Sequence, residues 1–169
     1  MKTSFSIFTD ASLNQKTNTG FGAYLILLNN EIENFSSEEM NHKVKLEKFF
    51  ESSISKLEIK ILIYALTELK NKFEDTDFYP LITVYTDSQG ITELNKRRQK
   101  LESSAFLSRN TKKELNNTAL YKEFFVLQDK LNFKIIKVKG HSKTVEKSNI
   151  EKIFTLVDRA SRKALRDII

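Results

Sequence analysis

The sequence contains no cysteine, no tryptophan, one proline and four glycines among its 169 residues. The absence of cysteine excludes disulfide scaffolds, thiol catalysis and every zinc site with sulfur ligands, and it agrees with a reducing compartment. No apolar run reaches the roughly 18 residues of a membrane-spanning helix, and no signal-peptide core follows the first residues. We therefore expect a cytoplasmic protein whose chemistry uses oxygen and nitrogen groups.

Nothing in the sequence resembles a repeat, a low-complexity segment or an interdomain linker. Because 40% of the residues are apolar, the chain can bury one sizeable core without disulfides or structural metals. We therefore expect a single domain over residues 1–169, with a monomer as the default state.

The positive charge of the chain is concentrated in one segment. The formal net charge is +6 and the pI is about 9.4. Residues 95–113 contain seven lysines and arginines and one acidic residue, so the rest of the chain is balanced. A solvated helix face usually alternates basic with acidic residues, and this segment lacks the acidic ones. The segment therefore predicts contact with the phosphate backbone of a nucleic acid.

The hydropathy pattern predicts a mixture of strands and helices. Alternating or short apolar runs predict strands over residues 4–9, 21–28, 31–35, 81–86 and 133–138. Helical spacing predicts helices over residues 55–72, after Ser88, over 118–131 and over 150–167. Asn29-Asn30 is interpreted as a hairpin turn, and residues 36–53 either extend the third strand or form an excursion. This order indicates a mixed α/β sheet covered by helices.

Two predicted strands end in the same pattern, in which an apolar run is followed by Thr-Asp and a small residue. The patterns are Thr9-Asp10-Ala11 and Thr86-Asp87-Ser88. Ligands of open α/β sheets bind beyond the carboxyl ends of strands, so Asp10 and Asp87 converge if their strands are neighbours. For either aspartate alone, ending a strand or capping a helix is the more common role. The pair favours a functional site.

Glu58 lies on the apolar stripe of its predicted helix, together with Leu62 and Ala65. A carboxylate that faces the sheet needs a metal, a partner or a shifted pKa. The alternative is a capping box, Ser55-x-x-Glu58, in which the glutamate satisfies a backbone donor near the helix start. The two roles are compatible.

The last helix carries one more candidate acid, and a histidine precedes that helix. Asp158 lies near the apolar face, and its structural alternative is an ion pair with Arg162, four residues later. His141 follows Gly140 in a polar segment, where an imidazole could carry protons near neutral pH. His42 is interpreted as a surface residue.

Six short motifs, in this order, resemble those of the type I ribonuclease H family. The motifs are Thr9-Asp10-Ala11-Ser12, Gly20-Phe21-Gly22-Ala23, Leu57-Glu58, Thr86-Asp87-Ser88-Gln89, Val138-Lys139-Gly140-His141-Ser142 and Val157-Asp158-Arg159-Ala160. The resemblance covers nearly the whole chain. It implies a ribonuclease H-like fold: a five-stranded mixed sheet, with three antiparallel strands and then two parallel ones, and helices on both faces.

The resemblance also implies an activity, namely hydrolysis of the RNA strand of RNA–DNA hybrids that leaves a 5′-phosphate. Asp10, Glu58, Asp87 and Asp158 would bind two Mg²⁺ ions, with Mn²⁺ as a possible substitute, because hard cations prefer oxygen ligands. His141 would assist proton movement or product release. Residues expected to contact the nucleic acid are Ser12, Asn14, Ser55, Gln89, Lys96, Arg97, Arg98, Lys100, Lys112 and Lys113.

The sequence departs from the family pattern at an asparagine pair that precedes the helix glutamate. Ile54 and Ser55 stand there. Proteins distinguish RNA from DNA largely through the 2′-hydroxyl, so this change bears on substrate preference. Three alternatives follow: a nuclease of the same fold for double-stranded or structured RNA or DNA, a binding module without turnover, and a domain that works only beside a partner protein. Retention of all four acids argues against the binding module.

Overall fold

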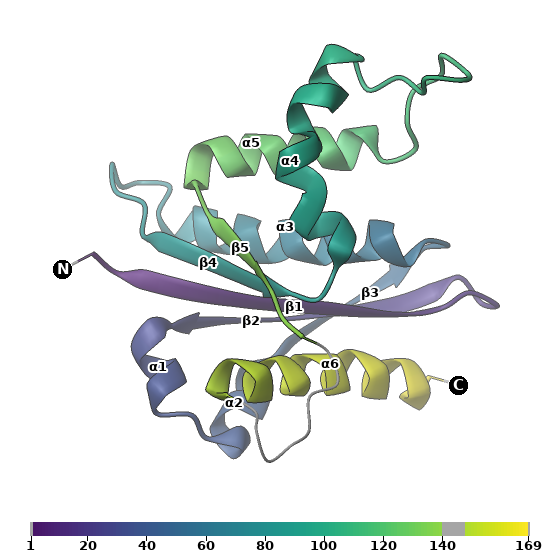
Figure 1. The fold of residues 1–169 in the computed structure, drawn as a ribbon. Coiled ribbons are helices and arrows are strands. Elements are labelled where there is room, and N and C mark those ends of the chain that lie inside the picture. The colour runs from purple at the N-terminus through teal and green to yellow at the C-terminus, as the bar shows by residue number, and fades with distance from the viewer. Residues whose placement is uncertain (1, 140–147, 169) are drawn as a thin grey trace.

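A computed structural model describes residues 2–139 and 148–168 of the chain. Its centre is a five-stranded mixed sheet in the order β3-β2-β1-β4-β5 (Figure 1). Pairs β1–β2 and β2–β3 are antiparallel, whereas β1–β4 and β4–β5 are parallel. The strands are β1 Ser4–Asn14, β2 Thr19–Leu28, β3 Lys45–Phe50, β4 Leu81–Thr86 and β5 Lys134–Lys137. The predicted fold class is confirmed.

Helices cover both faces of this sheet (Figure 1). One face carries α3, α4 and α5, and the other carries α1, α2 and α6. The helices are α1 Asn29–Glu33, α2 Ser37–Lys43, α3 Ile54–Lys72, α4 Gln89–Ser103, α5 Thr118–Leu131 and α6 Asn149–Asp167. Within the described ranges, no helix has both the length and the apolar character needed to cross a membrane.

The prediction of a third strand over residues 31–35 is wrong, because α1 occupies most of that segment. The Glu31 carboxylate accepts a hydrogen bond of 2.8 Å from the Leu28 backbone N–H, which caps the helix at its start. Ile32 packs against the core beneath α6. The third strand is β3, which lies in the segment that the sequence left open.

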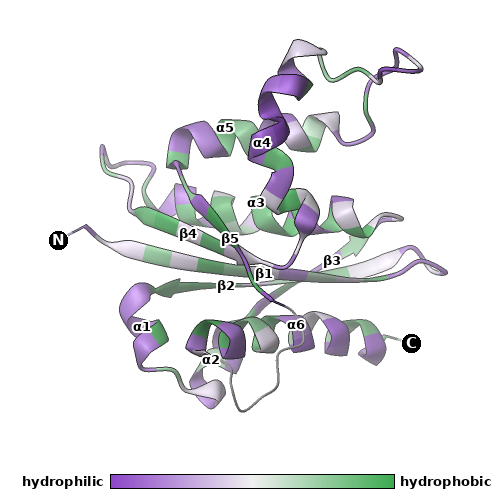
Figure 2. Cartoon of the chain, in the orientation of Figure 1, coloured by the Kyte–Doolittle hydropathy of each residue, from purple (hydrophilic) through white to green (hydrophobic). Residues whose placement is uncertain are grey.

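Each face of the sheet has its own hydrophobic core. Leu62, Leu66 and Leu69 of α3 are fully buried on one side. On the other side, Ile153 and Val157 of α6 are fully buried against the sheet. Figure 2 shows hydrophobic residues along β2 and β4 between these layers, while α4 is largely hydrophilic. The sheet is therefore held between two packed helical layers that fix the positions of its strand ends.

Two glycines of β2 allow α3 to approach the sheet closely. A Cβ atom at Gly20 would lie 2.5 Å from Leu57 Cδ2, and one at Gly22 would lie 2.5 Å from Ile61 Cγ1. Both distances are too short for real contacts, so larger residues would push the helix outward. Leu57 and Ile61 flank Glu58 in α3. The glycines therefore determine how near Glu58 lies to β1.

Candidate active site

The register between β1 and β4 brings Asp10 and Asp87 to the same level. Phe8 and Tyr85 form the last parallel pair of β1 and β4. Asp10 follows Phe8 by two residues, and Asp87 follows Tyr85 by two residues. The rings of Phe8 and Tyr85 stack with centroids 4.9 Å apart and an interplanar angle of 14°. Because side chains alternate along a strand, Asp10 projects from the same face of the sheet as the Phe8 ring, while Asp87 directly follows the last residue of β4. The two strands are neighbours, as convergence of the aspartates requires.

Glu58 is held by a hydroxyl group from another element. Its Oε2 atom accepts a hydrogen bond of 2.5 Å from Ser88 Oγ. The N-cap of α3 is Ser53, whose hydroxyl accepts from the Lys56 N–H, so the capping-box interpretation of Ser55 and Glu58 is wrong. Burial raises the pKa of Glu58, the Ser88 hydrogen bond lowers it, and the charge of Asp87 raises it.

Asp158 has partners on two sides. Its Oδ1 atom lies 2.8 Å from Arg162 Nε, which is the ion pair considered as its structural alternative. Its carboxyl group also lies close enough to that of Asp10 to raise the Asp10 pKa. The half-buried Asp158 therefore links α6 to β1 at the level of the other acids.

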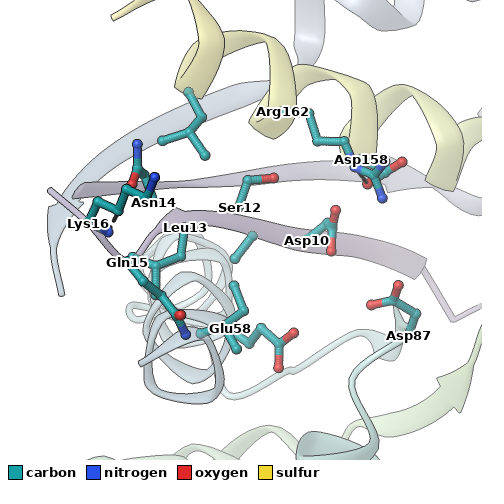
Figure 3. A pocket seen from close by; sticks show the side chains of 13 residues that line it. Asp10, Ser12, Leu13, Asn14, Gln15, Lys16, Glu58, Asp87, Asp158 and Arg162 are labelled. Carbon is teal, nitrogen blue, oxygen red and sulfur yellow. Dashed lines mark hydrogen bonds and ion pairs between the residues drawn. The ribbon is translucent and has the colours of Figure 1, made fainter. Parts of the chain in front are cut away.

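All four predicted carboxylates line one cleft with a volume of about 860 Å³. Figure 3 shows Asp158 and Arg162 approaching Asp10 from α6, while Glu58 and Asp87 face the cleft from the opposite side. The four acids come from β1, α3, the end of β4 and α6. The remaining lining residues are Ala11, Ser12, Leu13, Asn14, Gln15, Lys16, Ile54, Arg162 and Leu165.

Asp10 is the most buried of the four acids, with 7% of its surface exposed. Burial raises its pKa to about 8, with further contributions from the hydrogen bond with Asp158 and from the charges of Asp87 and Asp158. The Ala11 backbone N–H acts in the opposite direction. A buried carboxylate among other carboxylates is stable as an anion only if a cation compensates the charge.

The four carboxylates form a candidate site for divalent cations. Across residues 2–139 and 148–168, no three acidic or histidine side chains are placed to ligate one ion together. The chemistry of the set nevertheless fits, because four carboxylates supply only oxygen ligands, which Mg²⁺ and Mn²⁺ prefer. Because burial and the neighbouring acids raise the pKa of Asp10, a cation beside it would stabilise its charged form.

The described part of the chain contains one of the two histidines. His141 lies outside the described residues, so its predicted role stays a prediction. His42 is exposed on α2, in agreement with its interpretation as a surface residue.

Of the polar residues predicted to contact nucleic acid, two line the cleft. Asn14 lies at its rim, and Ser12 hydrogen-bonds to Ser161 at 2.9 Å between the two Oγ atoms. Ser55 pairs with Ser53 at 3.0 Å at the start of α3. Gln89 accepts a hydrogen bond from Lys137 on β5. The structure therefore brings Ser12 and Asn14 to the carboxylates and places the other two outside the cleft lining.

The basic segment, residues 95–113, forms the C-terminal part of α4 and the loop that follows it. Arg98 is held by Asp129 and Glu102, and its guanidinium lies 4.9 Å from the Phe125 ring centroid. Lys96 pairs with Glu93 at 3.2 Å. The remaining predicted contacts are exposed: Arg97, Lys100, Lys112 and Lys113. Arg98 therefore fastens α4 to α5, and the exposed residues are better placed for phosphates.

Three residues of the site were not among the predicted site residues. Ser88 caps α4 and bonds to Glu58, and its position after Asp87 at a helix start was the available signal. Ser161 is fully buried one helical turn after Asp158, a spacing that also places it on the inward face of α6. Lys16 is a cation of the β1–β2 turn, and nothing in the sequence indicated that it lines the cleft.

The mixed sheet, with an acidic cleft beside β1 and the end of β4, defines an α/β protein of the ribonuclease H-like fold. The family model described as RNase H matches residues 2–165. The chain therefore belongs to the RNase H family, which confirms the resemblance found in the sequence.

Solved structures agree in fold. The PFV RNase H domain is 17% identical with a TM-score of 0.68, and the match covers 96% of this chain and 94% of that one. LC9-RNase H1, a type 1 RNase H with the type 2 active-site motif, is 12% identical with a TM-score of 0.68 and coverages of 97% and 72%. LC11-RNase H1, solved with an RNA/DNA hybrid, is 17% identical with a TM-score of 0.58 and coverages of 95% and 99%. No curated protein sequence matches this chain.

Proposed function

We propose that the protein is a metal-dependent endoribonuclease that cleaves the RNA strand of RNA–DNA hybrids. The observation that carries this proposal is the meeting of four carboxylates, from four separate elements, in one open cleft. Membership of the RNase H family supports nuclease activity. The hybrid bound to LC11-RNase H1 supports the substrate class. A single domain over residues 1–169, acting as a monomer, is part of the same proposal.

The residues that would hold the metal are Asp10, Glu58, Asp87 and Asp158. Two bound Mg²⁺ or Mn²⁺ ions would supply an activated water and stabilise the leaving oxygen at phosphorus. The protein contributes the fixed positions of the acids. Asp10 is set by β1, Glu58 is held by Ser88, and Asp158 is carried by α6.

The remaining residues serve substrate binding and proton movement. Asn14 and Lys16 line the cleft on one side of the acids and can contact the RNA backbone. The exposed cations of α4 and its following loop, including Lys100 and Lys112, can bind phosphates of the DNA strand. His141 is proposed to assist proton movement or product release.

One observation favours a second substrate class. Ile54 lines the cleft with an apolar side chain where the family usually has an amide. An apolar group cannot hydrogen-bond with a 2′-hydroxyl, so discrimination of RNA from DNA at that point is weakened. Double-stranded RNA, structured RNA or DNA is therefore the second candidate substrate for the same chemistry.

The test is cleavage of an end-labelled substrate panel by the parent protein and by Asp10→Asn, with Mg²⁺ or Mn²⁺. The panel contains RNA–DNA hybrid, double-stranded RNA and double-stranded DNA. Cleavage confined to the RNA strand of the hybrid, and lost in Asp10→Asn, is the expected result. Cleavage of another duplex would support the second substrate class instead of the hybrid. Binding of hybrid without any cleavage would contradict nuclease activity altogether.

A further inference from the structure

Ser161 links the α6 helix to the acidic cleft through a fully buried hydroxyl group. The residue is 0% exposed and stands three positions after Asp158. Its Oγ atom lies 2.9 Å from Ser12 Oγ, 3.5 Å from Asp10 Oδ2 and 3.0 Å from the Asp158 carbonyl oxygen. A single hydroxyl therefore contacts β1 at two positions and its own helix at a third.

The Ser161 hydroxyl has one proton, and besides the Ser12 hydroxyl two acceptors lie within its reach. It can donate to the Asp158 carbonyl within α6, or it can donate to Asp10 Oδ2 across the helix–sheet interface. The Ser12 hydroxyl can donate to Ser161 in either case, which orders the pair. The 3.5 Å distance to Asp10 is at the long end of the hydrogen-bond range, and such contacts often shorten once a site is loaded.

We propose that Ser161 is a positioning residue that holds the Oδ2 side of the Asp10 carboxylate so that the group keeps one orientation toward bound cations. Ser12 supports it by orienting its hydroxyl. The proposal rests on the metal-dependent function proposed above. Groups that hydrogen-bond to metal-binding carboxylates typically change metal affinity by about 10- to 100-fold when they are removed.

The test is calorimetric titration of the metal-free protein with Mn²⁺, comparing the parent with Ser161→Ala. We expect the dissociation constant to rise about tenfold in Ser161→Ala. Ser161→Cys keeps the volume with a weaker donor, so we expect an intermediate increase, and this variant also serves if the alanine variant fails to fold. Higher Mn²⁺ concentration should restore hybrid cleavage by both variants, with KM for hybrid unchanged.

Ser6→Ala is the matched control. Ser6 also lies on β1, four residues before Asp10, and is 1% exposed. It donates a hydrogen bond of 2.7 Å to Asn29 Oδ1. We expect it to lose stability like Ser161→Ala, as measured by thermal unfolding, and to bind Mn²⁺ like the parent.

The outcomes separate this inference from the proposed function. If Ser161→Ala and Ser161→Cys bind Mn²⁺ as tightly as the parent, Ser161 is structural only and the inference is wrong, while hybrid cleavage by the parent can still stand. If the parent binds Mn²⁺ but cuts no hybrid, the proposed function is wrong, and the tenfold difference would still support the inference. Failure of the parent to bind Mn²⁺ would overturn both.

Discussion

The Ser88 hydroxyl donates a hydrogen bond of 2.5 Å to Glu58 Oε2 and so joins the start of α4 to α3. Ser88 Oγ also accepts a hydrogen bond of 3.4 Å from the Ile91 N–H, as the N-cap of α4. One side chain therefore stabilises a helix end and orients a proposed metal ligand.

Ser88→Ala is expected to lose both roles. Loss of the cap should lower the free energy of unfolding by about 1 kcal/mol. Loss of the hydrogen bond to Glu58 should reduce hybrid cleavage by about tenfold. Ser148→Ala is the matched control, because Ser148 caps α6 through the Glu151 N–H without contacting any of the four acids. Equal cleavage rates for the two variants would show that Ser88 is only a cap.

The raised pKa of Asp10 predicts that the metal-free protein loses stability as pH rises. The pKa is about 8 in the folded protein against an ordinary value of 3.8. Between these pH values the folded state binds more protons than the unfolded state, so the free energy of unfolding falls from about pH 4 to pH 8. Urea unfolding in the presence of EDTA measures this fall.

The Asp10→Asn variant tests the cause of that pH dependence. An amide carries no charge to bury, so we expect the variant to be more stable than the parent at pH 8 and to show a shallower decline. Added Mg²⁺ should stabilise the parent more at pH 8 than at pH 5 and should have little effect on the variant. A decline as steep as the parent's would mean that Asp10 is not its source.

The two close glycine contacts predict that Gly22→Ala is destabilising. The added methyl group would meet the Ile61 side chain at 2.5 Å and push α3 away from β2, which costs about 1–3 kcal/mol. Cleavage should also fall because Glu58 moves with α3. Gly90→Ala is the control, since its Cβ would have 3.8 Å to its nearest neighbour within a helix. A lower melting temperature for Gly90→Ala than for Gly22→Ala would contradict the packing argument.

The basic segment predicts two different responses to alanine substitution. Lys112→Ala and Lys113→Ala remove exposed charges, so each should weaken hybrid binding and lower the slope of log Kd against log salt by about one. Arg98→Ala removes an ion pair and a ring contact between α4 and α5 and should mainly lower the melting temperature. Fluorescence anisotropy at several salt concentrations measures the slopes. A larger slope change in Arg98→Ala than in Lys112→Ala would show that Arg98, and not Lys112, is the main phosphate contact.

Elements with strong periodicity were predictable from the sequence, whereas the edge strand β3 was not. The helix over residues 118–131 has the same bounds as α5, because Phe124, Leu127 and Leu131 all face the core. The third strand was misplaced because β3 is an edge strand with an exposed, weakly alternating pattern. Residues 31–35 resembled a strand, but the Glu31 cap and the packing of Ile32 favour a helix there.

The four acids were predictable as a set, and their supporting contacts were not. Asp10 and Asp87 each follow a similar apolar run, and a pattern repeated twice is visible in one sequence, although β1 continues past Asp10 to Asn14 and only Asp87 follows a strand end. The Ser12–Ser161 contact joins residues 149 positions apart, and the Arg98–Asp129 pair joins residues 31 positions apart. Partners at such separations depend on the tertiary fold, so the sequence showed neither the support of Asp10 nor the structural role of Arg98.

The most direct test of the account is cleavage of the RNA strand of an RNA–DNA hybrid by four single variants. These are Asp10→Asn, Glu58→Gln, Asp87→Asn and Asp158→Asn, each compared with the parent in Mg²⁺ and in EDTA. We expect EDTA to abolish cleavage by the parent and each variant to lose more than about a hundredfold in rate, because several kcal/mol of transition-state stabilisation depend on the metal site. Cleavage by the parent that persists in EDTA, or near-parental rates in these variants, would contradict it.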